Sequence, residues 1–281
     1  MTEKINQTEK VEKTEKSKKR AGFLDEVRGF AILCMVVYHA MFDLEAFFGK
    51  EVPIFFDNWF YYIWAVFAGS FIFISGIVCR YSSNNVKRGA QCFFFGMILT
   101  YVTVILAPEV AIQFGILHML GVSMMLYGLG EKIWDKGWLS PKIGMAISAF
   151  LFAITWNISG SKDRIDGVLT KIPGIVGLGA LSVRVPVKLY ELRLLFPLGF
   201  PSRDFYSGDF FPLMPWFFLF MTGAFFGVYV KNGKCPSFFY KTRVPFLAAV
   251  GRHTIWIYLF HQPVVLGVLY LGFWIFKILY G

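Results

Sequence analysis

Four ionisable residues share one side of a single apolar stretch, "LDEVRGFAILCMVVYHAMFDL" at residues 24–44. At about 100° per residue of helix, the step from Arg28 to His39 leaves only about 20° between the two side chains. Asp25 and Asp43 each fall about 60° from Arg28 on that same side. The stretch therefore predicts one helix with a polar stripe, in which about 16 Å separate the arginine from the histidine along the axis.

This stripe has the residue types needed for acid–base chemistry inside a membrane. An arginine or aspartate at the centre of a span costs about 2.5–3.5 kcal/mol, so such groups are functional candidates by default. Asp43 lies one turn beyond His39 and can accept a hydrogen bond from one imidazole nitrogen, leaving the other to act as a base. For Arg28 and Asp25, a second interpretation stays open, in which the arginine snorkels to the inner surface and the aspartate pairs with it. Glu26 falls roughly opposite the stripe.

Three other segments carry groups that suit chemistry in a membrane. "QFGILHMLG" places His118 between two glycines, which admit either a bulky ligand or a neighbouring helix. "GRHTIWIYLFHQPVV" has Arg252 at its cytoplasmic start, where it could meet phosphates or lipid head groups, and His261 and Gln262 two to three turns deeper. "SGDFFPLMPWFFLFMTG" contains Trp216, for which an aromatic belt at the outer interface is a sufficient explanation.

Several function classes have no support in the sequence. It contains no G-x-x-x-x-G-K-[ST], no G-x-G-x-x-G, no G-x-S-x-G and no clustered His and Cys ligands, so no nucleotide hydrolysis, nicotinamide chemistry or metal site is expected. The four cysteines are scattered without a C-x-x-C pair. The formal charge is +10, but no basic stripe is interleaved with exposed aromatics, so no nucleic-acid partner is expected.

The composition defines the elements that must position these residues. The chain has 281 residues, of which 56% are hydrophobic and 16% charged, whereas about 25% are charged in ordinary soluble domains. Repeated apolar runs near 20 residues long predict an all-α polytopic transmembrane helix bundle in a lipid bilayer. We expect about seven spans (six to eight), at 27–48, 59–80, 88–107, 110–130, 143–158, 211–230 and 253–278.

The remaining segments set the topology. Residues 1–20 predict a disordered, basic cytoplasmic tail, and residues 21–281 a transmembrane domain. Lysines and arginines in the short loops of one side place the N-terminus inside and, with seven spans, the C-terminus outside. The 159–210 connection is long enough to escape that bias, and its Gly/Pro-broken piece at 172–187 is expected to be re-entrant or interfacial. Whether 172–187 enters the membrane is left open, as is homo-oligomerisation through the Gly and Ser faces.

Three motifs together resemble one known family. "LDEVRGFAILCMVVYHAMFDL", "FGILHMLGVS" and "GRHTIWIYLFHQPV", with "FFPLMPWFFLFMTGAFFG" between the last two, are similar to the heparan-α-glucosaminide N-acetyltransferase-like family, of which this looks like a short prokaryotic member. The similar blocks run from about residue 22 to 268, with 132–206 matching poorly. The spacing of Arg28 and His39 also resembles the Arg-ten-residues-His signature of acyltransferase-3-type membrane enzymes.

The resemblance implies an integral-membrane acyltransferase of the cell envelope, in a bacterial cytoplasmic membrane. Acyl-CoA, in the first instance acetyl-CoA, would bind on the cytoplasmic side, and the acceptor would be an envelope glycan or a small amine. The positions that match the family are Arg28 and His39, with His118 and His261 as secondary candidates. From the residues themselves we further expect Asp43 to assist His39 in catalysis, Asp25 and Arg252 to join Arg28 at the coenzyme, and Gln262 and Trp216 to join His118 and His261 at the substrate or an oxyanion. In the eukaryotic enzyme the histidine usually proposed as catalytic lies in the loop after the first helix. The corresponding loop here, "GKEVPIFFDN", has no histidine, so His39 would have to serve.

A different class of protein could use the same stripe. A secondary transporter or proton-coupled flippase could relay protons through Asp, Arg and His side chains, and broken helices are common in such proteins. The spans show no internal inverted repeat that would favour this alternative. In a non-catalytic membrane scaffold, the free-energy cost of burying these histidines would have no explanation.

Overall fold

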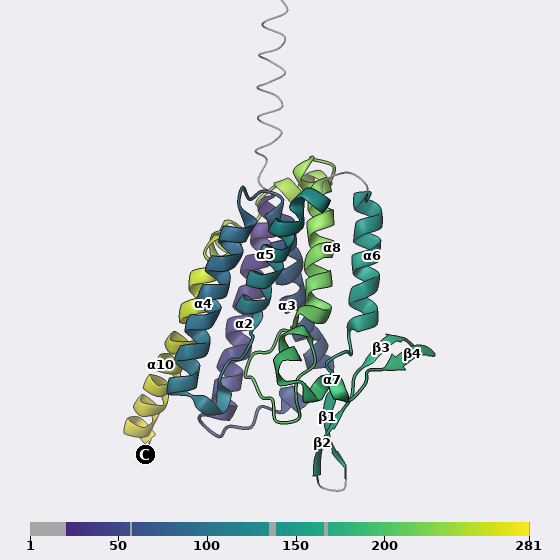
Figure 1. The fold of residues 1–281 in the computed structure, drawn as a ribbon. Coiled ribbons are helices and arrows are strands. Elements are labelled where there is room, and N and C mark those ends of the chain that lie inside the picture. Colours follow the sequence, from purple (N-terminus) through teal and green to yellow (C-terminus); the bar gives the residue numbers. More distant parts are fainter. Residues whose placement is uncertain (1–20, 57, 135–138, 166–167, 281) are drawn as a thin grey trace, which may run out of the picture. The chain divides into compact units, whose positions relative to one another are not determined.

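The computed structural model describes residues 21–56, 58–134, 139–165 and 168–280. Within these residues every expected span is a helix, and Figure 1 shows them: α2 Gly22–Ala46, α3 Asn58–Cys79, α4 Asn85–Leu106, α5 Ile116–Trp134, α6 Pro141–Thr155, α8 Leu213–Lys231 and α10 Thr254–Tyr280. The predicted all-α membrane bundle is confirmed. Five of the helices (α2, α3, α4, α8 and α10) are long and apolar enough to cross a bilayer, whereas α5 and α6 are apolar but shorter. The expected tail at 1–20 lies outside the described residues.

The fifth helix starts later than its hydropathy predicts. The expected span at 110–130 begins instead at Ile116, because η2, a single 3₁₀ turn at Pro108–Val110, precedes it. Phe114 then adopts a positive φ of 59°, which breaks any continuous helix at that point. A carboxylate oxygen of Asp209 accepts a 3.2 Å hydrogen bond from the backbone N–H of Ile116, one of the donors that a helix start leaves unsatisfied.

The chain divides into two compact units, of which the first comprises Met1–Ile74 and Val230–Gly281. In it, α2 packs against α10 and against a short helix that hydropathy did not single out, α9 at Pro245–Arg252, which follows the 3₁₀ turn η4 at Ser237–Tyr240. The approach of α2 to α9 is very close: a Cβ added at Gly29 would collide with the carbonyl oxygen of Leu247, and one at Gly251 with that of Asp25. Two glycines therefore set the spacing of this helix pair.

The second unit, Ser75–Tyr229, contains α4, α5, α6 and most of α8. Its α4 and α5 pack tightly, since a Cβ at Gly89 would lie 2.6 Å from the carbonyl oxygen of Gly121. The 159–210 connection forms two antiparallel hairpins, which Figure 1 shows as separate arrows. They are β1 Ser161–Ile165 with β2 Val168–Ile172, and β3 Ile175–Leu178 with β4 Leu181–Arg184, followed by α7 Lys188–Glu191 and η3 Arg193–Leu198.

The hairpins refine the expectation for 172–187. A two-stranded sheet leaves open edges, which are not tolerated where they face lipid in the hydrocarbon region. Of the two alternatives, this secondary structure favours an interfacial segment over a re-entrant one. Its base is held by a small core of Ile158, Val185, Tyr190 and Phe200.

Candidate functional site

The polar stripe of α2 faces α10. Each residue of the stripe from Arg28 onwards contacts that helix, in the pairs Arg28–Thr254, His39–His261 and Asp43–Gln262. Residue numbers rise together along both helices, so α2 and α10 run parallel. The stripe that helical periodicity predicts is therefore the seam between the first and last helices of this unit.

Two histidines meet at this seam. The ring centroids of His39 and His261 lie 4.9 Å apart with an interplanar angle of 53°. Nδ1 of His261 lies 2.8 Å from the carbonyl oxygen of Tyr258, and a carbonyl only accepts, so Nδ1 carries the hydrogen. In the neutral ring Nε2 then carries the lone pair and can accept a proton. The ring of His39 also meets that of Tyr38 edge-on at 5.6 Å.

A buried carboxylate lies one turn further along the seam. The amide Nε2 of Gln262 donates a 2.6 Å hydrogen bond to Oδ1 of Asp43, whose side chain is fully buried. The other oxygen, Oδ2, is buried with no hydrogen-bond partner among the described residues. The expected hydrogen bond from His39 to Asp43 is not formed within these residues; the carboxylate is held through Oδ1 by the amide of Gln262. Asp43 thus fixes α10 rather than the tautomer of His39.

The end of the seam at the starts of α2 and α10 is held by an arginine. Nη2 of Arg28 donates a 2.8 Å hydrogen bond to Oγ1 of Thr254, the first residue of α10. The guanidinium also lies 5.6 Å from the ring centroid of Phe71, at cation–π distance. Asp25 is buried near the start of α2, whereas Arg252 is exposed at the end of α9. Of the three residues expected to bind coenzyme, Arg28 is thus the one built into the seam.

Glu26 has a role that the helical wheel does not reveal. Its carboxylate is buried and accepts hydrogen bonds from the backbone N–H groups of Arg243 and Val244, the second at 2.8 Å. These groups lie at the start of α9, where a negative charge also complements the helix dipole. The only sequence signal was a glutamate in an apolar stretch facing away from the stripe, and its partner lies more than 200 residues away.

His118 lies in the second unit and is a core residue there. It is only 3% exposed, its ring stacks on that of Phe114 at 5.7 Å, and its Nε2 lies 3.4 Å from Oγ1 of Thr100. A Cβ added at Gly96 would lie 2.9 Å from Nδ1. The glycine on the neighbouring helix thus makes room for the imidazole, which favours the packing interpretation of His118.

Trp216 also belongs to the second unit, where it packs inside rather than in an exposed aromatic belt. It is 5% exposed and its ring lies 5.3–5.9 Å from three other aromatic rings, those of Phe152, Trp156 and Phe211. The expectation of an interfacial belt assumed that a tryptophan near the end of a span faces outward. Here its neighbours along the sequence and on α6 cover it.

In the part of the chain that the structure describes, no three His, Cys, Asp or Glu side chains are grouped to hold a metal ion.

Comparison with protein families gives one extended match. The family described as "Heparan-alpha-glucosaminide N-acetyltransferase, catalytic" matches residues 20–263, which includes the whole seam from Asp25 to Gln262. Neither the curated proteins nor the solved structures contain a match to the chain.

Proposed function

The chain belongs to the heparan-α-glucosaminide N-acetyltransferase catalytic family, and on that premise we propose a specific donor and acceptor for it. The family makes the protein a membrane acetyltransferase. The proposed donor is acetyl-CoA on the cytoplasmic side. The proposed acceptor is a hydroxyl or amine of a sugar-containing molecule of the envelope, on the other side of a bacterial cytoplasmic membrane.

One observation carries this proposal: the His39–His261 pair lies beside the buried Asp43–Gln262 contact within one helix seam. A histidine pair can supply both a base and an acid, and such catalysis typically contributes about 10²–10⁴-fold. In the proposed reaction the acceptor N or O forms a bond to the acetyl carbonyl carbon while a histidine removes its proton. The C–S bond of the thioester then breaks, and the histidine returns the proton to the leaving CoA sulfur.

The tautomer of His261 suggests how the two histidines share the roles of base and acid. Because Nδ1 of His261 is committed to the carbonyl of Tyr258, its Nε2 can serve as a base or, once protonated, as a donor to the developing oxyanion. His39 would then be the partner that exchanges a proton with the acceptor. Transfer through an acetyl-histidine intermediate is the alternative route with the same residues.

The coenzyme side of the proposal rests on Arg28. A guanidinium presents five N–H donors, so the hydrogen bond to Thr254 leaves others to meet phosphate or pantetheine oxygens. Asp25 would orient the arginine, and the exposed Arg252 would meet the phosphates. The matching site on the acceptor side would use Gln262 and the two histidines.

An acetyl-transfer assay tests the proposal. Purified protein is incubated with radiolabelled acetyl-CoA and an envelope extract, and label in the acceptor fraction is compared for wild type, His39→Ala and His253→Ala. His253 is exposed at the end of α9 and serves as the matched histidine control. Transfer by wild type and His253→Ala, with a loss of about 10²-fold or more in His39→Ala, is the expected result.

Each failure has a different meaning. If wild type neither binds acetyl-CoA nor transfers label, the proposed donor is wrong. If His39→Ala transfers label as fast as wild type, the donor stands and the role of His39 is wrong. In proteoliposomes, proton flux coupled to solute movement without acetyl transfer would support the transporter alternative, which the family match does not favour.

A further inference from the structure

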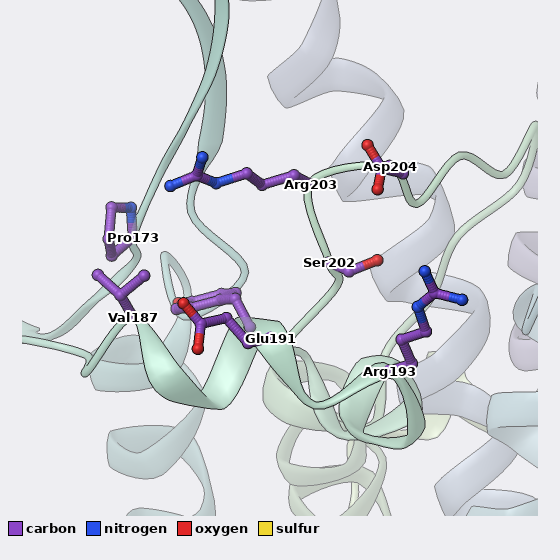
Figure 2. A pocket seen from close by; sticks show the side chains of 8 residues that line it. Pro173, Val187, Glu191, Arg193, Ser202, Arg203 and Asp204 are labelled. Atoms are coloured by element: carbon purple, nitrogen blue, oxygen red, sulfur yellow. The ribbon is translucent and has the colours of Figure 1, made fainter.

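A pocket that is lined mostly by residues with charged or polar side chains lies in the connection between α6 and α8, entirely within the second unit. Its volume is about 230 Å³, below the roughly 300–1,000 Å³ of pockets that enclose drug-sized ligands, so it suits one ring of a larger molecule. Figure 2 shows charged side chains from α7, from the start of η3 and from the loop after η3 gathered around it. No residue expected to take part in acetyl transfer lines it.

The base of the pocket is a fixed tyrosine. The hydroxyl of Tyr190 donates to the carbonyl oxygen of Ile158 and accepts a 2.8 Å hydrogen bond from the backbone N–H of Gly174. The side chain is 3% exposed, and burial raises the pKa of its hydroxyl, which therefore stays protonated and able to donate. Tyr190 ties the helical turn α7 to the base of the hairpins, so the pocket has a preformed frame.

The pocket brings together two cations and two anions. Arg193 and Arg203 supply donors, while Glu191 and Asp204 supply acceptors. All four are exposed, and Figure 2 shows Arg203 extending toward the side of the pocket where Pro173 lies. In the described part of the chain no ion pair or hydrogen bond joins these four side chains to one another. Their polar groups are thus available to a ligand that needs donors and acceptors together.

From this arrangement we infer that the pocket binds one hydroxyl-rich sugar ring of a glycan. Each sugar hydroxyl both donates and accepts, so it can use a carboxylate and a guanidinium at once. A phosphate could use only the arginines and would be repelled by Glu191 and Asp204. Pro173 and Val187 add an apolar edge against which the C–H face of a ring can pack. The inference rests on the proposed function only in that it supplies a binding site for the sugar-containing acceptor.

The test is a binding experiment without acetyl-CoA. Full-length protein in detergent is titrated with N-acetylglucosamine, and binding is followed by saturation-transfer NMR, with inorganic phosphate as the competing probe. We expect saturable sugar binding that phosphate does not displace. Glu191→Gln and Arg203→Gln should each weaken it by about tenfold, as expected for loss of a hydrogen bond to a charged group.

The control is Arg184→Gln, an exposed arginine on β4 that does not line the pocket, and it should bind the sugar like wild type. Acetyl transfer by Glu191→Gln, Arg203→Gln and Arg184→Gln is measured in parallel, so that loss of sugar binding and loss of acetyl transfer are recorded separately. Absence of saturable binding, displacement by phosphate, or unchanged affinity in both pocket variants would overturn the inference. Elution of each variant as a single monodisperse peak excludes misfolding as the cause of a loss.

Discussion

Gln262 on α10 donates a 2.6 Å hydrogen bond to Asp43 on α2, and the carboxylate that receives it is fully buried. The contact joins the first and last helices of the matched region next to the two histidines. A buried carboxylate that loses its donor keeps its desolvation cost without compensation. Gln262 is therefore a positioning residue for the seam, and its removal should alter the positions of His39 and His261.

Substituting Gln262 should lower both stability and acetyl transfer. Gln262→Ala removes one hydrogen bond to a charged group, a loss of about 1.5–3 kcal/mol in the free energy of unfolding. Gln262→Glu should be worse, because it sets a second carboxylate against Asp43. Thermal unfolding in detergent measures the first effect and the acetyl-transfer rate the second. Gln91→Ala, at an exposed position of α4, is the matched control; equal Tm values for all variants would contradict the role of Gln262.

The two histidines should act as a unit. If one serves as the proton acceptor and the other as its partner, His39→Ala and His261→Ala should each lower the transfer rate by about 10²-fold or more. The double variant should be only slightly slower than the worse single variant, because residues that act as a unit are not additive. The measurement is kcat/KM for all four proteins. Strictly multiplicative losses would mean that the rings only pack together.

Glu26 should matter for folding more than for catalysis. Glu26→Ala removes the acceptor of two backbone N–H groups at the start of α9, and comparable helix caps are worth about 0.5–2 kcal/mol. We expect a lower Tm with a smaller effect on transfer per folded molecule. Glu51→Ala, at an exposed loop position, is the control. A loss of transfer without any loss of stability would indicate a direct catalytic role for Glu26.

The two glycines at the close contact between α2 and α9, Gly29 and Gly251, should not tolerate a larger residue. At Gly29 and at Gly251 an added Cβ collides with a backbone carbonyl of the partner helix, and backbone cannot rotate away. Overpacking of this kind typically costs about 1–3 kcal/mol, so Gly29→Ala and Gly251→Ala should lower the Tm. Gly267→Ala on α10 has nothing within 4 Å of its added Cβ and should leave the Tm unchanged or slightly raised. Equal Tm values for all three variants would contradict the close backbone contact between α2 and α9.

The parallel pairing of α2 and α10 makes a prediction about sidedness. The Phe48 ring lies 4.8 Å from that of Tyr270 and 4.5 Å from that of Phe273, so the loop after α2 lies beside the far half of α10. A cysteine at Lys50 should react with an impermeant maleimide added outside cells. One at Lys234 should react only after permeabilisation, as the positive-inside bias predicts. A variant without Cys34, Cys79, Cys92 and Cys235 provides the background, and reaction of both sites from one side would contradict this topology.

Helix type and position could be predicted because apolar length and 3.6-residue periodicity are local properties of the chain. The stripe of Arg28, His39 and Asp43 follows from the same periodicity, and the structure confirms that one face of α2 carries it. Partners could not be predicted in this way. A carboxylate four residues from a histidine has the right spacing for a hydrogen bond to it. In the structure, however, the carboxylate of Asp43 accepts a hydrogen bond from the amide of Gln262 on another helix.

The errors at helix ends and in the long connection have a similar cause. Hydropathy averages over a window, so it missed the positive φ of Phe114 and the capping by Asp209 that delay α5 to Ile116. Short β hairpins carry a weak local signal, and the core that anchors them at Tyr190 comes from segments far apart. The short helix α9 lies too close to α10 for hydropathy to separate them.

The shared direction of α2 and α10 also constrains the helices between them. Two parallel transmembrane helices must be separated by an odd number of crossings, and five apolar helices (α3, α4, α5, α6 and α8) lie between these two along the chain. The shorter pair, α5 and α6, must therefore both traverse or both fail to do so. If both traverse, the 15 residues of α6 span only about 22 Å, less than the roughly 30 Å of an average hydrocarbon core. The bilayer around α6 would then have to be thinner than average, or α6 would need flanking residues to reach its surfaces.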